Sequence, residues 1–175
     1  MNRRLPAGLT AAGLALTLFG AAAVGPDDSA EAPAPPPSVE EARQRARLLH
    51  GTIHDTLQIV HARYYREDEG LMIPAASFKQ VFQEVEERDG VKLRWLVVDG
   101  RAMNIDHNPK DDFEKGAAKA LASGRVQHEL VADGVYRYAG PITLRAECLK
   151  CHAPGRSSNK SRTAGLLISI PIAKK

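Results

Sequence analysis

The sequence contains few cysteines and few aromatic residues, and it carries no large excess of either charge. Of its 175 residues, 2 are cysteines and 5% are aromatic. So few thiols exclude a disulfide-rich scaffold and a structural zinc site made of two Cys pairs. The formal net charge of +3, from 24 basic and 21 acidic residues, does not indicate nucleic-acid binding.

The sequence shows no internal repeat, which excludes a solenoid or propeller. Its length suits one domain of ordinary size and is too short for two comfortable ones. A hydrophobic fraction of 43% is enough for a globular core.

Residues 1–24 have the pattern of a secretory signal peptide. The positively charged MNRR precedes an apolar run of small residues, LPAGLTAAGLALTLFGAAA, with cleavage expected near Ala21 to Ala23. The apolar run is also long enough to remain as an N-terminal membrane anchor. In both cases we expect a periplasmic or otherwise extracytoplasmic protein.

Residues 25–38, GPDDSAEAPAPPPS, are rich in proline and alanine. Such a composition cannot bury a core and predicts an extended linker. The folded domain is therefore expected over residues 39–175.

The stretch CLKCH, from Cys148 to His152, contains both cysteines of the chain. This arrangement is rare by chance, and Cys-x-x-Cys-His is the attachment motif of c-type haem. The two thiols add across the two vinyl groups of one haem, and the adjacent imidazole binds the iron. The motif predicts one covalent haem c held by Cys148 and Cys151, with His152 as the proximal iron ligand. Export fits this interpretation, because bacterial haem c is attached outside the cytoplasmic membrane.

Three alternatives use similar residues. A structural zinc site needs four ligands, and remote histidines would have to complete it at an unusual spacing. A thioredoxin-like redox pair normally belongs to a βαβ unit, which the sequence does not indicate. A disulfide between Cys148 and Cys151 would close a very small loop and leave His152 unexplained.

Periodicity and turn residues predict an α+β fold in which the helices come first. Three helices are expected over residues 38–66, 74–90 and 108–124, beginning at Ser38, Pro74 and Asn108–Pro109 respectively. Strands are expected over residues 91–98, with a partner around 101–104, and over residues 125–132, 135–140, 141–146 and 164–172. Asp133–Gly134 favours a hairpin, so the sheet should be antiparallel.

The order of these parts resembles the PAS-like single-haem c-type protein family, long described only as a domain of unknown function. The resemblance covers most of residues 39–172 and is carried by RYYRE (63–67), DHNPKDDFE (106–114), YRYAGPI (136–142) and CLKCHAP (148–154). It implies a PAS-like fold with one haem c. Members stand alone behind a signal peptide or serve as extracytoplasmic input modules of histidine kinases and chemotaxis receptors.

The chain departs from the family pattern at two positions and in one ligand type. His107 stands where arginine is often found before Asn-Pro, and Ala153 stands where glycine often follows the haem histidine. Some members place a cysteine on the distal side of the iron. This chain has no cysteine beyond Cys148 and Cys151, so that ligand cannot be transferred.

The candidate distal iron ligands are histidines of the first predicted helix. His50, His54 and His61 lie together at the border of its apolar stripe, and His54 and His61 rank first because they have the most apolar neighbours. A solvated helix flank is the alternative for each. The remaining candidates are weaker and have simpler structural roles: His107, His128, Met72 and Met103. A five-coordinate iron is a further alternative.

Other residues could line a haem pocket or serve only the fold. On the first strand, Leu93 and Trp95 should share one face, and Leu96 and Val98 the other. Either face could pack on a porphyrin. Arginines that could pair with haem propionates, if they are not simply solvated, are Arg94, Arg137 and Arg145.

These observations predict an exported monohaem c-type protein with a redox or electron-transfer role, or a role in haem-based sensing. The expected partner is a redox protein or a membrane signalling protein, and a diatomic-gas sensor would have to act through such a partner. The alternative is a peroxidase-like enzyme with a distal acid/base pair, for which His54 or His61 with Glu67 are the candidates. Nothing in the spacing demands that pair.

Overall fold

The computed structural model describes residues 35–102, 104–153 and 155–173. The predicted signal peptide or anchor, most of the predicted linker, and Met103 lie outside the described residues. Pro37, which the sequence assigns to the linker, is buried, and its carbonyl accepts a hydrogen bond of 3.0 Å from the Ala173 N–H. The folded part therefore includes the residues just before the first helix.

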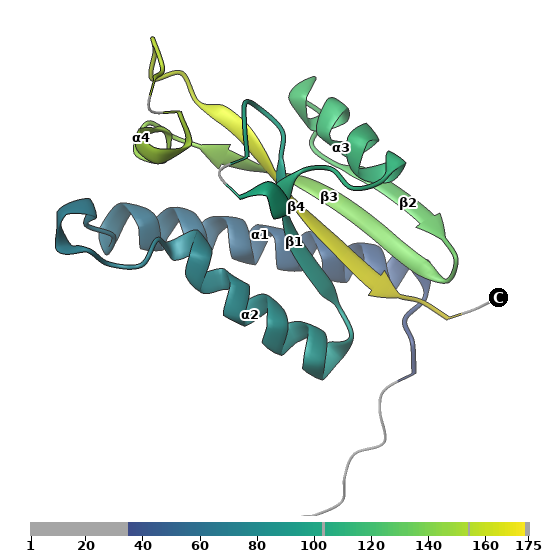
Figure 1. Cartoon of the computed structure of the whole chain (residues 1–175). Helices are drawn as coiled ribbons and strands as arrows, with labels where there is room; N and C mark the ends of the chain where they lie inside the picture. Colours follow the sequence, from purple (N-terminus) through teal and green to yellow (C-terminus); the bar gives the residue numbers. More distant parts are fainter. Residues whose placement is uncertain (1–34, 103, 154, 174–175) are drawn as a thin grey trace, which may run out of the picture. The chain divides into compact units, whose positions relative to one another are not determined.

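The protein is α+β, as predicted, with a four-stranded antiparallel sheet (Figure 1). The helices are α1 (Val39–Arg63), α2 (Pro74–Asp89), α3 (Asp112–Ala122) and the single turn α4 (Leu149–His152), with short 3₁₀ turns at η1 (Glu67–Glu69) and η2 (Ile105–His107). The strands are β1 (Lys92–Val97), β2 (His128–Ala132), β3 (Val135–Leu144) and β4 (Arg162–Pro171).

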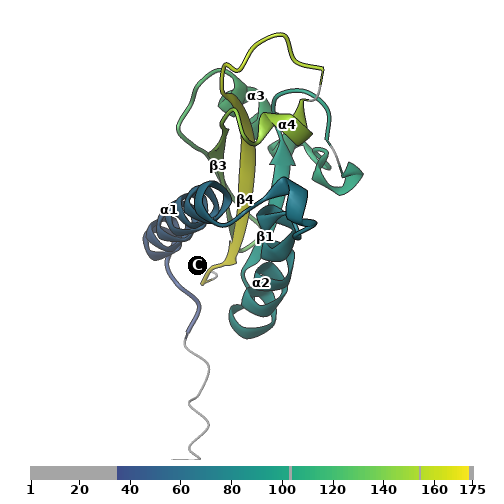
Figure 2. The same cartoon turned by 90° about the vertical axis from the view of Figure 1, so that its left-hand side faces the viewer.

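The strand order is β1-β4-β3-β2, so the C-terminal strand lies in the middle of the sheet. β4 pairs with β1 on one side, from Lys92↔Ser169 to Val97↔Ala164, and with β3 on the other. β2 and β3 form the hairpin predicted at Asp133–Gly134, where both residues have positive φ. Helices cover both faces of this sheet, α1 and α2 on one and α3 on the other (Figures 1 and 2).

Each face of the sheet has its own apolar core, as the alternation of side chains along the strands requires. Leu93 and Trp95 belong to the larger core under α1 and α2, and Leu96 and Val98 to the smaller core under α3, as predicted. In the larger core Trp95 lies edge-on to Phe78, and its indole N–H donates to the Ala75 carbonyl at 3.1 Å. α2 therefore fixes the orientation of this ring.

The start of α1 is set by a capping box. The Ser38 hydroxyl accepts a hydrogen bond from the Glu41 N–H, and the Glu41 carboxylate accepts one from the Ser38 N–H. Both contacts satisfy amide groups that a helix N-terminus otherwise leaves without partners. The predicted N-cap was correct, and the helix ends at Arg63, three residues before the predicted end.

Three predictions about local structure were wrong. The third helix begins at Asp112 rather than near Pro109, because the Asp111 side chain caps it by accepting from the Glu114 N–H at 2.9 Å. No strand forms at residues 101, 102 and 104 of the described chain, because Asp99 turns towards β4 and exchanges hydrogen bonds with Thr163. The runs 135–140 and 141–146 are one continuous strand, β3, through Pro141.

α1 lies very close to β3, and this contact orients the half of the helix that carries the candidate ligands. A Cβ atom placed on Gly140 would lie 2.5 Å from two ring atoms of His50. The His50 Nε2 is 2.9 Å from the Pro141 carbonyl, and the Gln58 amide donates to the Thr143 carbonyl at 2.8 Å. Glycine at position 140 is required here for close approach, not for backbone conformation.

Candidate functional site

A cavity of about 660 Å³ opens between the C-terminal half of α1, the end of β1 and the segment that carries the two cysteines. Its floor is the larger core face of the sheet, with Trp95, Ile142 and Ala164. Both cysteines line it. The volume lies within the roughly 300–1,000 Å³ typical of pockets that hold small ligands and cofactors.

The cysteine segment is held in place by one buried side chain and one arginine. After β3 ends, Cys148 begins the turn α4, and Leu149 is fully buried beneath it. The Arg156 guanidinium donates to the Leu149 carbonyl at 3.0 Å, and this carbonyl also accepts the Ala153 N–H at 3.0 Å. The same arginine donates to the Asn159 side chain at 3.0 Å, which ties the following loop to α4.

Cys148 and Cys151 are both free thiols, and both are half-buried. Burial raises the pKa of the Cys148 thiol, so this sulfur stays protonated near neutral pH. Cys148 is the N-cap of α4 and Cys151 lies within it, and both residues line one cavity. The two thiols can therefore reach one bound molecule.

His152 ends α4 and lines the same cavity. His152 is exposed on the side that borders the cavity. Partial burial by nearby protein atoms nevertheless lowers the pKa of its imidazole, and the charge of His61 lowers this pKa further. His152 is therefore neutral near pH 7, which is the form that binds metal ions.

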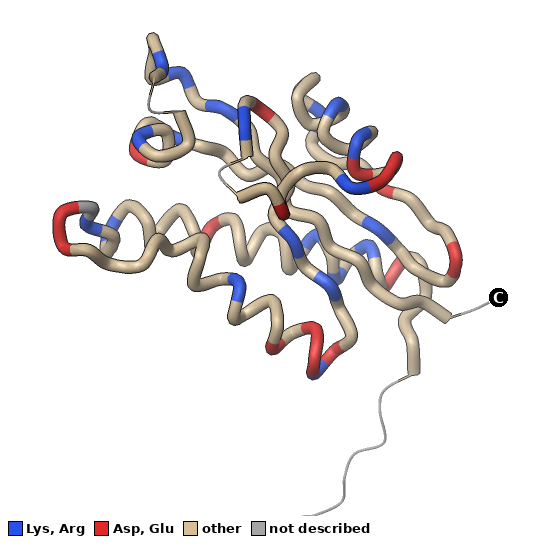
Figure 3. The backbone as a smooth tube through the Cα atoms, in the orientation of Figure 1, with Lys and Arg blue, Asp and Glu red and all other residues tan. Residues whose placement is uncertain are grey.

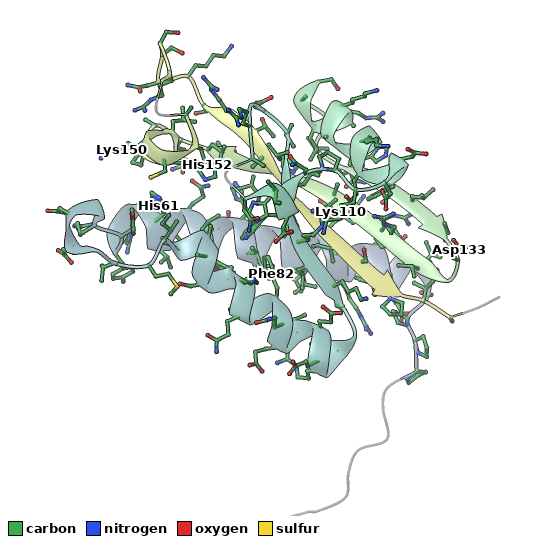
Figure 4. All side chains as sticks on the ribbon, viewed as in Figure 1. His61, Phe82, Lys110, Asp133, Lys150 and His152 are labelled. Atoms are coloured by element: carbon green, nitrogen blue, oxygen red, sulfur yellow. The ribbon has the colours of Figure 1, made fainter. Side chains whose placement is uncertain are left out.

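His61 comes from α1 and lines the cavity together with His152. Figure 4 shows the two histidines at the same end of the fold, on α1 and on α4. The Tyr65 ring, two residues after the end of α1, has its centroid 5.0 Å from that of His61. Of the two histidines ranked first in the sequence, His61 is the one that the fold brings to the cysteines.

His54 and His50 are not among the residues that line this cavity. His54 lies 2.9 Å from the Asp55 carboxylate through its Nδ1. His50 is held between α1 and β3 by Pro141 and Gly140, and burial lowers its pKa. Both occupy the α1 flank further from the cysteine segment.

His107 also lines the cavity, from the turn η2. The turn is fixed by Arg94, whose guanidinium donates to the carbonyls of Asp106 at 2.5 Å and Asn108 at 3.3 Å. Burial and the charge of Arg94 lower the pKa of His107. His107 is thus a second imidazole that the described cavity offers in addition to His61.

The other candidate ligands lie elsewhere. His128 packs against the Phe113 ring with centroids 5.3 Å apart, under α3. Met72 is 71% exposed and lines a separate shallow groove between α1 and α2. Met103 and the side chain of Glu67 are outside the described part of the structure.

Two of the three arginines considered for propionates have other partners. Arg94 and Arg137 both pair with Glu114, which is only 6% exposed, and Arg137 also pairs with Asp111 at 2.7 Å. The Glu114 carboxylate further accepts from the Lys110 N–H at 2.5 Å. These contacts hold the segment DHNPKDDFE against β1 and β3, so Asp111 and Glu114 serve the fold.

Two arginines that the sequence did not single out line the cavity instead, Arg66 and Arg101. Arg66 follows the end of α1, and Arg101 follows the turn at Asp99–Gly100. Both arginines follow a point where the chain changes direction, so the fold brings them to the cavity. The sequence around them has no helical or strand periodicity that could have predicted this.

The residues of this cavity fit a covalent haem better than the alternatives. Two thiols and an imidazole at Cys-x-x-Cys-His spacing share one wall, and two further imidazoles, those of His61 and His107, line the same space. A thioredoxin-like site would need a βαβ unit, whereas every strand pair described here is antiparallel. Over residues 35–102, 104–153 and 155–173, no group of three or more His, Cys, Asp or Glu side chains is placed to hold a metal ion such as zinc.

Within the described residues, no helix has the length and apolar character needed to cross a membrane. This finding does not extend to residues 1–34, where the signal peptide or anchor is expected.

Comparison with known proteins gives a family match and a structural match. The family model described as Tll0287-like matches residues 37–166. The crystal structure of the cyanobacterial heme-protein Tll0287 has a TM-score of 0.56 to this chain at 15% identity, and the alignment covers 78% of this chain and 98% of that one. At this identity the structural match shows a shared fold alone. A comparison with curated proteins gives no match.

Proposed function

Because the chain belongs to the Tll0287-like family, we propose that it binds haem, and more specifically that it is an exported monohaem c-type protein that transfers single electrons. The protein Tll0287 is described as a heme-protein. The observation that supports the finer assignment is the cavity in which Cys148, Cys151, His152 and His61 meet.

Cys148 and Cys151 would hold the cofactor. Each would supply a thiol S–H that can add across one vinyl C=C bond of a haem, the sulfur to one carbon and the hydrogen to the other. The reaction needs reduced thiols, which is the state of both cysteines here. The buried Leu149 and the contacts of Arg156 fix the turn that carries them.

His152 and His61 would be the two axial ligands. Both line the cavity from opposing elements, α4 and α1, and the neutral His152 has a lone pair available for iron. A bound haem supplies reversible one-electron chemistry at its iron. If both imidazoles held the iron, no coordination site would be left for a gas or a peroxide, which would favour electron transfer over gas sensing or peroxidase chemistry.

The proposed compartment is extracytoplasmic, and the proposed partner is a redox protein. The signal-peptide pattern of residues 1–24 supports export, and the proposed haem c, which bacteria attach outside the cytoplasmic membrane, fits the same compartment. Whether the leader is removed or stays as an anchor decides only whether the domain diffuses or is tethered.

Absorption spectra of the holoprotein, with and without carbon monoxide, test the proposal. The expected wild-type spectrum is low-spin in both oxidation states and does not change with carbon monoxide. His61→Ala is expected to give a high-spin iron that binds carbon monoxide, because it removes one axial ligand. His54→Ala is the matched control on the same helix and should leave the spectrum unchanged.

Two results would contradict the assignment. Rapid carbon monoxide binding by the wild type would favour a gas sensor or an enzyme. A low-spin spectrum that survives His61→Ala but is lost in His107→Ala would move the distal ligand to η2.

A further inference from the structure

The segment that carries the cysteines is strongly basic. Residues 145–162 contain five basic residues and one acidic residue, which gives them a net charge of +4. The whole chain has a net charge of +3, so the remaining residues together carry −1. The excess positive charge of the protein is thus concentrated at one end of the fold.

These charges lie on the segment that carries the two cavity-lining cysteines, and Lys150 itself lines the cavity. Figure 3 shows Lys and Arg gathered along α4, the loop after it and the start of β4. The Arg162 guanidinium also lies close to Gly100, 3.8 Å from the position of an added Cβ, and so brings β4 next to Arg101. We name this set the basic collar: Arg101, Arg145, Lys150, Arg156, Lys160 and Arg162.

The collar is available for contact. Arg101, Arg145, Lys150 and Lys160 are exposed. No ion pair to an Asp or Glu is found for Arg101, Arg145 or Lys160 within the described residues. Three such positive charges without an ion pair, at Arg101, Arg145 and Lys160, create a local positive potential that attracts a negatively charged partner.

We propose that the basic collar is the docking surface for an acidic redox protein. The inference rests on the proposed function, because it takes the cavity walled by Cys148, Cys151 and His152 as the haem site. Arg101 and Lys150 of the collar line that cavity, and Arg156 contacts the turn that carries the cysteines, so a partner bound to the collar would lie next to the cysteine segment. Charge complementarity of this kind mainly accelerates encounter and orients the partner, which suits a brief electron-transfer contact.

An anionic membrane surface would attract the same charges, but the cysteine segment has no exposed large hydrophobic residue that could insert into a bilayer. In the segment 145–162, which supplies five of the six collar residues, the large aliphatic residue Leu149 is fully buried, and the exposed large hydrophobic residues of the described chain all lie outside this segment. Membrane-surface elements normally combine basic residues with exposed apolar or aromatic ones. The composition of the collar therefore favours a soluble acidic protein.

The test uses full-length holoprotein in which two collar residues are reversed in charge, Arg145→Glu/Lys160→Glu. The matched control is Lys79→Glu/Arg125→Glu, which changes the net charge equally at exposed positions on α2 and after α3. The measured quantity is the bimolecular rate constant for electron transfer to an oxidised acidic blue-copper protein, by stopped-flow absorption over a range of salt concentrations.

The wild-type rate constant is expected to fall steeply with salt. The collar variant should react about tenfold more slowly at low salt and lose most of its salt dependence, while the control pair stays within about twofold of the wild type. Oxidation by a small uncharged quinone should be equal in all three proteins. The proposal is overturned if the electron-transfer rate constant falls equally in both double variants, or if it falls in neither.

Two further measurements distinguish a failure of the docking proposal from a failure of the proposed haem function. Sedimentation with phosphatidylglycerol vesicles that requires the collar, without any salt-dependent reaction with the acidic protein, would assign the collar to a membrane and refute the protein partner. A haem spectrum is recorded for each variant. If the wild type carries no haem, the proposed function fails. If all variants carry normal haem and react alike, only the docking proposal fails.

Discussion

Replacing Gly140 with alanine should strongly destabilise the contact between α1 and β3. The added methyl carbon would lie 2.5 Å from the Cδ2 and Nε2 atoms of His50 and 2.9 Å from its Cε1. The ring cannot swing away freely, because its Nε2 lies 2.9 Å from the Pro141 carbonyl. The whole imidazole or the helix that carries it must therefore move.

The expected loss combines two terms. Overpacking of this kind costs about 1–3 kcal/mol, and loss of the hydrogen bond to Pro141 costs about 1 kcal/mol more. We therefore expect Gly140→Ala to lower the free energy of unfolding by about 2–4 kcal/mol, which a domain stable by roughly 5–15 kcal/mol can survive. His61 lies three turns beyond His50 on the same helix, so its distance from α4 should also increase.

Urea unfolding followed by far-ultraviolet circular dichroism measures this loss. Gly51→Ala is the matched control, because Gly51 is next to His50 on α1 and nothing lies within 4 Å of an added Cβ there. It should stabilise the helix by about 0.5–1 kcal/mol. Adding His50→Ala to Gly140→Ala should recover part of the loss. If Gly140→Ala costs less than about 0.5 kcal/mol, the close approach of α1 to β3 is not as described.

Two further stability predictions follow from buried charge and from histidine burial. Glu114→Gln should cost about 2–3 kcal/mol in urea unfolding, because it leaves two arginines short of a partner, whereas Lys115→Gln, which breaks only an exposed pair, should cost less than about 0.5 kcal/mol. Burial lowers the pKa of His50 below its usual 6.5, so the unfolded chain takes up this proton first. Stability should then be complete above about pH 6.5 and decrease as the pH falls towards the folded-state pKa, with a smaller decrease in His50→Gln. Equal costs for Glu114→Gln and Lys115→Gln, or a stability that rises on acidification, would contradict these accounts.

The parts of the fold that the sequence predicted well have local causes. Ser38 with Glu41 defines the start of α1, Pro74 and Gly90 delimit α2, and Asp133–Gly134 makes the β2–β3 hairpin. In each case the residues that decide the structure are within a few positions of one another.

The parts that were mispredicted depend on contacts between distant segments. Asp99 was expected to turn into a strand partner for β1, but its carboxylate and N–H bond to Thr163, 64 residues later, so β4 takes that place. Asn108–Pro109 looks like a helix start, but Arg94 holds the Asn108 carbonyl, and the capping side chain is Asp111. Such competition is not visible in a local sequence pattern.

The candidate site shows the same division. The cysteine motif is continuous in sequence and could be identified directly. Helical periodicity placed His54 and His61 on one flank of α1, but it could not show which of them reaches the cavity, because that depends on where α4 packs. Arg66 and Arg101 were missed for the same reason.

The measurement that tests the central claim most directly is the intact mass of the mature protein, made in a host that exports and matures c-type cytochromes and analysed under denaturing conditions. We expect the polypeptide mass increased by one haem, carried by the peptide that contains Cys148 and Cys151, and lost when both are replaced by alanine. A mass equal to that of the polypeptide alone would contradict the account.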